Sequence, residues 1–279
     1  MDKIKLITDS TADLPDDIIK KYNIEVIPLF VIIDKKTYRD GIDIKLPQLL
    51  SKMESSSEFP STAQINPEIF MNCYKKYLDE GYKIFSIHIS SKMSGTYQSA
   101  CIAKNMLESD DIVIVDSFNV TSGLGLQVIK AAELIKKGLS IKNLENEILE
   151  YSTHVKSTIE FNSLDNLVKG GRLSKTAGMI GNILGIKIIV AAKNGEIVVM
   201  DKARGSKKAL KNMLGYIDKK GAKKDELAIL LHAGETEVLN PFRDELINRN
   251  IKFIESEVGC VVGVHSGTGA CGLFFVENY

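Results

Sequence analysis

Hydroxyl side chains are concentrated in a short turn, SSKMSGT, at residues 90–96. An apolar run over 84–89 precedes this turn, and residues 97–106 follow it with apolar positions at helical spacing. The first N–H groups of a helix lack internal partners and its dipole is positive there, so such a turn can bind an anion. Ser94 is the expected N-cap. The turn predicts either a well-capped helix or a site for an anionic group.

Further polar turns follow other short apolar runs. The run over 4–7 ends in Asp9-Ser10, and the run over 112–115 ends in Asp116-Ser117. His265 is expected in a glycine-containing turn at a strand end. Hydroxyls near a histidine have two uses. They supply a nucleophile and its base, or they hold a carboxylate by hydrogen bonds. The residues alone leave both uses open.

Familiar signatures of cofactor and metal chemistry are missing from the sequence. It has no GxxxxGK[ST], HExxH or GxSxG pattern, and Gly123-Leu124-Gly125 is only weak evidence for a nucleotide. The cysteines at 73, 101, 260 and 271 have no CxxC spacing. We expect reduced cysteines, no metal site and no cofactor.

The polar turns require elements that bring them together. Strands alternate with helices over the first ~150 residues, which predicts a mainly parallel sheet with helices on both faces. Ligands of such sheets lie beyond the carboxyl ends of the strands. Asp9-Ser10, the turn at 90–94 and Asp116-Ser117 are therefore expected at one edge.

The second half has a different pattern. Residues 187–192 and 196–202 flank Asn194-Gly195 and predict a hairpin with a type I′ turn. The fold class is therefore α/β with two α/β domains, the second built on a mixed or antiparallel sheet with helices. We place the domains at residues 1–156 and 157–279.

Composition excludes several classes of function. Lys+Arg and Asp+Glu both number 36, which gives no electrostatic case for binding nucleic acid. The N-terminal residues MDKIKLITDS lack the apolar core of a signal peptide, and no apolar stretch reaches the roughly 20 residues that span a bilayer. We expect a cytoplasmic protein.

Taken in order, the turns resemble the motifs of the DegV family over nearly the whole chain. The matching segments are TDSTADLP (8–15), YRDGIDI (38–44), FPSTAQINP (59–67), ISSKMSGTYQSA (89–100), VDSFNVTSGLG (115–125), LVKGGRLS (167–174) and VGCVVGVHSGTGACGLFF (258–275).

The resemblance implies a non-catalytic bacterial protein that holds a long-chain fatty acid in a tunnel between the two domains. It implies that the protein presents the carboxylate to a separate ATP-binding fatty acid kinase subunit, for phospholipid synthesis, with a transient contact to a membrane surface. Family resemblance places Thr62 and Ser94 on the carboxylate. The polar network around the carboxylate is then formed by His265, Arg172, Gly95 and Ser91, and Arg204 is expected near the tunnel entrance or the partner surface.

Apolar residues are candidates for the tunnel wall or for ordinary core. They are Ile27, Phe30, Met93, Ile180, Ile183, Leu184 and Ile189. The sequence departs from the family pattern at Cys260, Thr268 and Ile188, where the family commonly has proline, and at Ile65-Asn66. These departures bear on tunnel shape and chain-length preference, and they leave Thr62, Ser94 and His265 in place.

Two alternatives to a binding protein remain at this stage. One is an acyl hydrolase that uses Ser94 with His265, and the other is a lipid-responsive regulator. No basic stripe or helix-turn-helix pattern supports a DNA-binding regulator.

Overall fold

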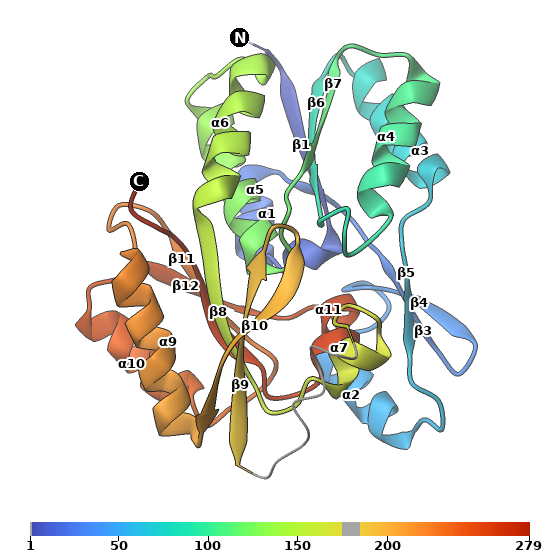
Figure 1. Ribbon diagram of the computed structural model, residues 1–279. Coiled ribbons are helices and arrows are strands. Elements are labelled where there is room, and N and C mark those ends of the chain that lie inside the picture. The colour runs from blue at the N-terminus through green and yellow to red at the C-terminus, as the bar shows by residue number, and fades with distance from the viewer. Residues whose placement is uncertain (1, 175–184) are drawn as a thin grey trace.

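A four-stranded parallel sheet forms the upper part of the molecule in the computed structural model, which describes residues 2–174 and 185–279 (Figure 1). Its order is β2-β1-β6-β7, and every pairing is parallel. The strands are β1 (Ile4–Asp9), β2 (Glu25–Ile27), β6 (Lys83–His88) and β7 (Ile112–Asp116). The parallel sheet predicted for the first half is confirmed.

Helices follow the strands of this sheet, as expected for βαβ units. They are α1 (Asp16–Tyr22), α3 (Pro67–Asp79), α4 (Thr96–Leu107), α5 (Ser122–Lys136) and α6 (Ile141–His154). Helices α3 and α4 pack together, and α5 and α6 pack together on the other side (Figure 1). Both faces of the sheet are therefore covered.

A six-stranded mixed sheet forms the lower part, with order β10-β9-β8-β13-β11-β12. Its strands are β8 (Val155–Phe161), β9 (Ile186–Lys193), β10 (Glu196–Arg204), β11 (Ala228–His232), β12 (Phe253–Glu257) and β13 (Cys271–Val276). Only the β11–β12 pair is parallel. The α/β fold class with a mixed second sheet is confirmed. In the β9–β10 hairpin, Asn194 and Gly195 both have positive φ, as a type I′ turn requires.

Helix α5 lies between the two sheets. It contacts β1 and β6 of the parallel sheet as well as β8, β11 and β13 of the mixed sheet. Eleven of its fifteen residues are buried, as expected for a helix that is apolar on all sides. Helices α9 (Ser206–Lys220) and α10 (Leu239–Asn248) follow on the outer side of the mixed sheet (Figure 1).

A small antiparallel sheet, β4-β3-β5, was not predicted. It consists of β3 (Phe30–Ile33), β4 (Lys36–Arg39) and β5 (Ser61–Ala63). The apolar run over 24–33 divides around Pro28 and contributes β2 to one sheet and β3 to another. Residues 61–63 between Pro60 and Pro67 form β5, because Thr62 pairs with Val31. Three residues are too few for a strand pattern in sequence.

Short helices surround this small sheet. They are the 3₁₀ turn Ser10–Ala12 and the helices α2 (Leu46–Ser55), α7 (Asp165–Lys169) and α11 (Cys260–Ser266). Helix α11 contacts α2, α7, β3 and β5. One hydrophobic cluster contains residues from both halves, from Ile7 to Val276. The proposed boundary at 156/157 falls inside β8 and stays a prediction.

Among the residues that the structure describes, no helix is both long and apolar enough to cross a membrane.

We predict that Gly272→Ala destabilises the protein by about 1–3 kcal/mol, because overpacking a dense core forces backbone shifts. A Cβ on Gly272 would lie 2.5 Å from the carbonyl oxygen of Thr158 on the paired strand β8. Urea unfolding measures the change. Gly215→Ala is the matched control. Its Cβ meets nothing within 4 Å in the exposed face of α9, so it should stabilise by about 0.5–1 kcal/mol. Equal stabilities of the two variants would contradict this packing argument.

Candidate ligand-binding site

A cavity of about 1000 Å³, including the part that opens to solvent, lies between the two sheets. Its walls come from turns at the ends of β1, β6 and β7, from β5, and from β8, β9, β11 and α11. Thr62, Ser94, Gly95, Arg172 and His265 line it together. The structure thus brings five sequence-predicted site residues to one cavity, although they come from segments far apart in the chain.

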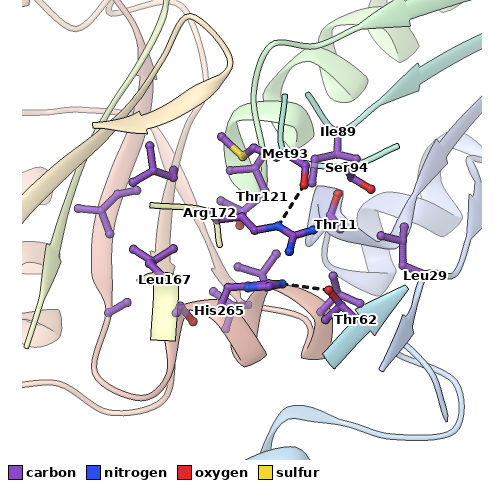
Figure 2. A pocket seen from close by; sticks show the side chains of 18 of the residues that line it. Thr11, Leu29, Thr62, Ile89, Met93, Ser94, Thr121, Leu167, Arg172 and His265 are labelled. Carbon is purple, nitrogen blue, oxygen red and sulfur yellow. Dashed lines mark hydrogen bonds between the residues drawn. The ribbon is translucent and has the colours of Figure 1, made fainter. Parts of the chain in front are cut away.

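Thr62 and His265 meet across the two halves. Thr62 Oγ1 lies 3.0 Å from His265 Nε2 (Figure 2). His265 was expected in a turn, but it lies in the last turn of α11. The segment 260–266 is rich in β-branched valine and too short to display a helical period, which explains the error. His265 Nδ1 is buried, and it has no hydrogen-bond partner among the described residues.

Arg172 extends across the cavity toward the Ser94 turn (Figure 2). Its Nε donates to the Met93 carbonyl at 3.1 Å, and its Nη1 donates to the Gly170 carbonyl at 2.6 Å. Among the described residues it forms no ion pair with a carboxylate. Burial alone lowers its pKa, and the guanidinium remains charged at neutral pH. The cavity therefore contains a half-buried positive charge with no acidic neighbour among the described residues.

Ser94 and Gly95 form the start of α4. Gly95, and not Ser94 as predicted, is the N-cap residue. The Ser94 hydroxyl accepts the Thr96 N–H at 3.3 Å and lies 2.9 Å from the Thr96 hydroxyl. A Cβ on Gly95 would lie 2.0 Å from Gln64 Oε1, so a larger residue here would require the Gln64 side chain to move. The anion-favouring helix start predicted from the sequence therefore faces the cavity.

Two predicted site residues lie outside this cavity. Ser91 is exposed, and its backbone N–H faces the Asp116 carboxylate at 3.3 Å. Arg204 is exposed at the end of β10, paired with Ile186. At about 3.3 Å per residue, the strand carries Arg204 on the order of 25 Å from the hairpin turn, where Gly195 contacts Ser90.

Strand alternation decides which apolar residues reach the cavity. Ile159 and Phe161 of β8, Val190 of β9 and Leu231 of β11 line it. Of the predicted wall residues, Met93 lines it, whereas Ile27, Phe30 and Ile189 do not. Ile189 belongs to the cluster beneath α9, on the opposite face from Val190. Ile180, Ile183 and Leu184 lie outside the described residues. The departures Cys260, Thr268, Ile188, Ile65 and Asn66 do not line the cavity.

Thr11, Gln64 and Thr121 also line the cavity and were missed. Thr11 belongs to the polar turn after β1, and it donates through its N–H and hydroxyl to Asp9. Asp9 Oδ2 accepts the Ile89 N–H at 3.0 Å. The Asp9 turn and the turn after β6 therefore meet at one sheet edge, as predicted. The predicted position of Asp9 at this edge could have indicated Thr11, two residues further on.

A Ser-His-Asp arrangement does occur, but it is sealed inside the parallel sheet. Ser86 Oγ lies 2.6 Å from His88 Nε2, and His88 Nδ1 lies 3.0 Å from Asp9 Oδ2. All three side chains are fully buried, and Ser86 and His88 do not line the cavity. A substrate cannot reach Ser86, so we assign this group a structural role.

Within the described part of the chain, no group of three or more His, Cys, Asp or Glu side chains is arranged to hold a metal.

Comparisons with known proteins support a single family. The family model "Uncharacterised protein, DegV family" matches residues 3–278. A DegV domain-containing protein of Clostridium acetobutylicum is 55% identical over the full length of both chains. The solved structure of a DegV family protein from Thermus thermophilus, described by its fatty acid binding, has a TM-score of 0.92, with 30% identity and coverage of 99% and 100%. The fatty acid kinase B3 protein of Streptococcus pneumoniae, loaded with linoleic acid, has a TM-score of 0.86, with 25% identity and full coverage of both chains.

We predict that His265 makes stability depend on pH between about 4 and 6.5. Burial, reinforced by the charge of Arg172, lowers the pKa of His265 to about 4. The unfolded chain therefore binds more protons than the native chain as the pH falls through this range, and stability is lost. At pH 5 the loss is about 2 kcal/mol relative to pH 7. Chemical unfolding of wild type and His265→Gln at both pH values measures it.

Buried Asp13 and Asp40 have raised pKa values, so their contribution to stability increases as the pH falls, opposite to that of His265. The difference in pH dependence between wild type and His265→Gln therefore isolates the contribution of His265. His232→Gln serves as a control outside the cavity. A His265→Gln variant with the same pH dependence as wild type would contradict the assignment.

Proposed function

The chain belongs to the DegV family, and on that basis we propose that it binds a long-chain fatty acid in the cavity between its sheets, with the carboxylate at Thr62, Ser94, Arg172 and His265. DegV family proteins bind fatty acids, as the described function of the Thermus thermophilus relative states. The observation that carries the proposal here is the Arg172 guanidinium, which forms no ion pair with a described carboxylate and lies beside Thr62, Ser94 and His265 in a largely apolar cavity.

The polar end suits a carboxylate. A buried carboxylate is costly unless charged or N–H and O–H donors surround it. Arg172 supplies the charge. Thr62 and Ser94 supply hydroxyls, and His265 stays neutral at pH 7, so it can donate one ring N–H. A neutral histidine also spares Arg172 the repulsion of a second cation.

The apolar walls suit an acyl chain. Ile159, Phe161, Val190, Leu231 and Val261 present only hydrocarbon, and burial is worth roughly 0.8 kcal/mol per methylene. A chain of many methylenes therefore provides most of the affinity, while the polar end fixes its direction.

Acyl hydrolysis by Ser94 and His265 has less support. A serine nucleophile needs a base within hydrogen-bond reach. His265 Nε2 is paired with Thr62, and the Ser94 hydroxyl is paired with Thr96. We therefore propose a binding protein without catalysis of its own.

We also propose that the bound carboxylate is presented to an ATP-binding kinase subunit in the cytoplasm, which forms the acyl phosphate. Similarity to the fatty acid kinase B3 protein supports this partner. In this proposal ATP belongs to the partner, and this chain needs no cofactor. The exposed Arg204 belongs to the surface that contacts this partner, away from the fatty acid site. A transient contact with a membrane surface delivers or removes the acyl chain.

We predict that Ser94→Ala and Thr62→Val each weaken fatty acid binding by about 1–3 kcal/mol, the cost of leaving a charged acceptor unmet. Titration of delipidated protein with oleate, followed by calorimetry, measures the affinity. Ser152→Ala, which removes an exposed hydroxyl on α6, is the matched control and should bind as wild type does. Wild-type affinity in the Ser94→Ala, Thr62→Val double variant, or no lipid retained by the purified protein, would refute the site.

For the partner, we predict that Arg204→Ala retains oleate binding but loses about tenfold or more in ATP-dependent phosphorylation of that oleate by a fatty acid kinase ATP-binding subunit. A lost interfacial charge contact has this magnitude. Incorporation of labelled phosphate into the acyl group measures the rate. Lys202→Ala, next to it on β10, is the control. Equal rates for the Arg204→Ala variant and wild type would remove Arg204 from the partner surface.

A further inference from the structure

A second cavity, of about 980 Å³ including its open part, lies beside the first and shares only Val258 with it. Its walls come from the turn after β1, the start of α1, the turn after β4 and the start of α11. Five carboxylates line it, against one lysine. The carboxylates are Asp9, Asp13, Asp16, Asp40 and Glu257, and the lysine is Lys45. The proposed fatty acid site uses none of them.

Two of these carboxylates are buried side by side at the start of α11. Asp13 Oδ1 accepts the Gly259 N–H at 2.9 Å, and Asp40 Oδ1 accepts the Cys260 N–H at 2.7 Å. A Cβ built on Gly259 would lie 2.7 Å from Asp13 Oδ1 and 3.2 Å from Asp40 Oδ2. Asp13 Oδ2 is also satisfied, by the Thr121 hydroxyl at 2.5 Å.

Asp40 is the member with an unsatisfied oxygen. It is only 3% exposed, yet its Oδ2 accepts no hydrogen bond from the described residues. Burial raises the Asp40 pKa, and the Ser10 hydroxyl and the Cys260 and Val261 N–H groups beside the carboxylate offset this only in part. Among the described residues, no cation forms an ion pair with Asp13 or Asp40, and Lys45 is exposed at the rim. A buried acidic oxygen without a donor, in a cavity open to solvent, points to a cationic ligand.

The walls also indicate which kind of cation fits. A bare divalent ion needs several oxygen ligands converging at 2.0–2.6 Å, and the carboxylates here are not grouped in that way. Hydrocarbon from Ala12, Leu14, Ile19, Val26 and Leu46 lines the rest of the cavity. Such a mixed surface accommodates an N–H donor head with a short apolar body.

We propose that this second cavity binds a free small organic cation, an alkylammonium or alkylguanidinium, with its N–H donors on Asp40 Oδ2 and its apolar part against α1, β2 and α2. The ligand supplies the hydrogen bond to Oδ2 and the positive charge that none of the described residues gives to Asp40.

Isothermal titration calorimetry with n-butylammonium chloride and n-butylguanidinium chloride, at constant ionic strength set with potassium chloride, tests the proposal. We expect saturable binding of at least one probe to wild type. Asp40→Asn should weaken it about tenfold or more, the effect of losing a charged hydrogen bond. The asparagine retains an acceptor for the Cys260 N–H. Asp17→Asn removes an exposed carboxylate that does not line the cavity and should change the affinity by no more than about twofold.

Ile42→Lys provides a test that does not alter the buried pair. Ile42 is exposed and lines the cavity, so this variant places a tethered ammonium at the rim and should also weaken binding of the probes. Oleate titrations of the same variants should match wild type, which separates this proposal from that of the fatty acid site.

Three results would overturn the proposal. The first is the absence of saturable binding by both probes, and the second is equal binding to wild type and Asp40→Asn. The third is tighter binding of magnesium chloride alone than of either organic cation, which would assign the cavity to a metal.

Discussion

Burial of α5 between two sheets is the constraint on which the rest of the molecule depends. An apolar helix can satisfy both of its faces only by contact with hydrophobic surfaces on two sides, and here the parallel sheet and the mixed sheet provide them. Gly125 allows the close approach, because its Cβ would lie 2.8 Å from the Ala12 carbonyl. With α5 fixed, the carboxyl ends of β1 and β6 face the inner surface of β8, β9 and β11, and the first cavity lies between them.

The polar and apolar groups that line this cavity come from different kinds of structural element. Donors come from turns and helix ends, where backbone and hydroxyl groups are not committed to a sheet ladder. Hydrocarbon comes from the strand interiors, whose alternate residues face the cavity. Arg172 belongs to the turn after α7 and interacts with the Met93 carbonyl of the opposite half, so the charged group also joins the two halves.

Buried charge is the recurring cost of this arrangement. Helix α11 connects the two cavities: His265 lies in its last turn, and the N–H groups of Gly259 and Cys260 at its start donate to Asp13 and Asp40. Carboxylates are favourable at a helix N-terminus, since its N–H groups and dipole stabilise negative charge. Desolvation nevertheless outweighs this for both aspartates, whose pKa values are raised.

The sequence by itself determined the alternation of elements, the parallel first sheet, the type I′ hairpin and the shared edge of the Asp9 and Ser90 turns, because these follow from local patterns of period 2 and 3.6 and from turn residues. Thr62, Ser94, Gly95, Arg172 and His265, which line the cavity, were expected at the site from the family resemblance, and Ser94 and His265 also from their polar turns. Only the tertiary structure decided that β5 is a strand, that His265 ends a helix, and that Val190 rather than Ile189 faces the cavity. These features depend on which distant segment packs against each residue. The positions of Thr11, Gln64 and the Asp13–Asp40 pair could not be predicted from the sequence for the same reason. Contacts between side chains of different sheets produce no periodic pattern along the chain.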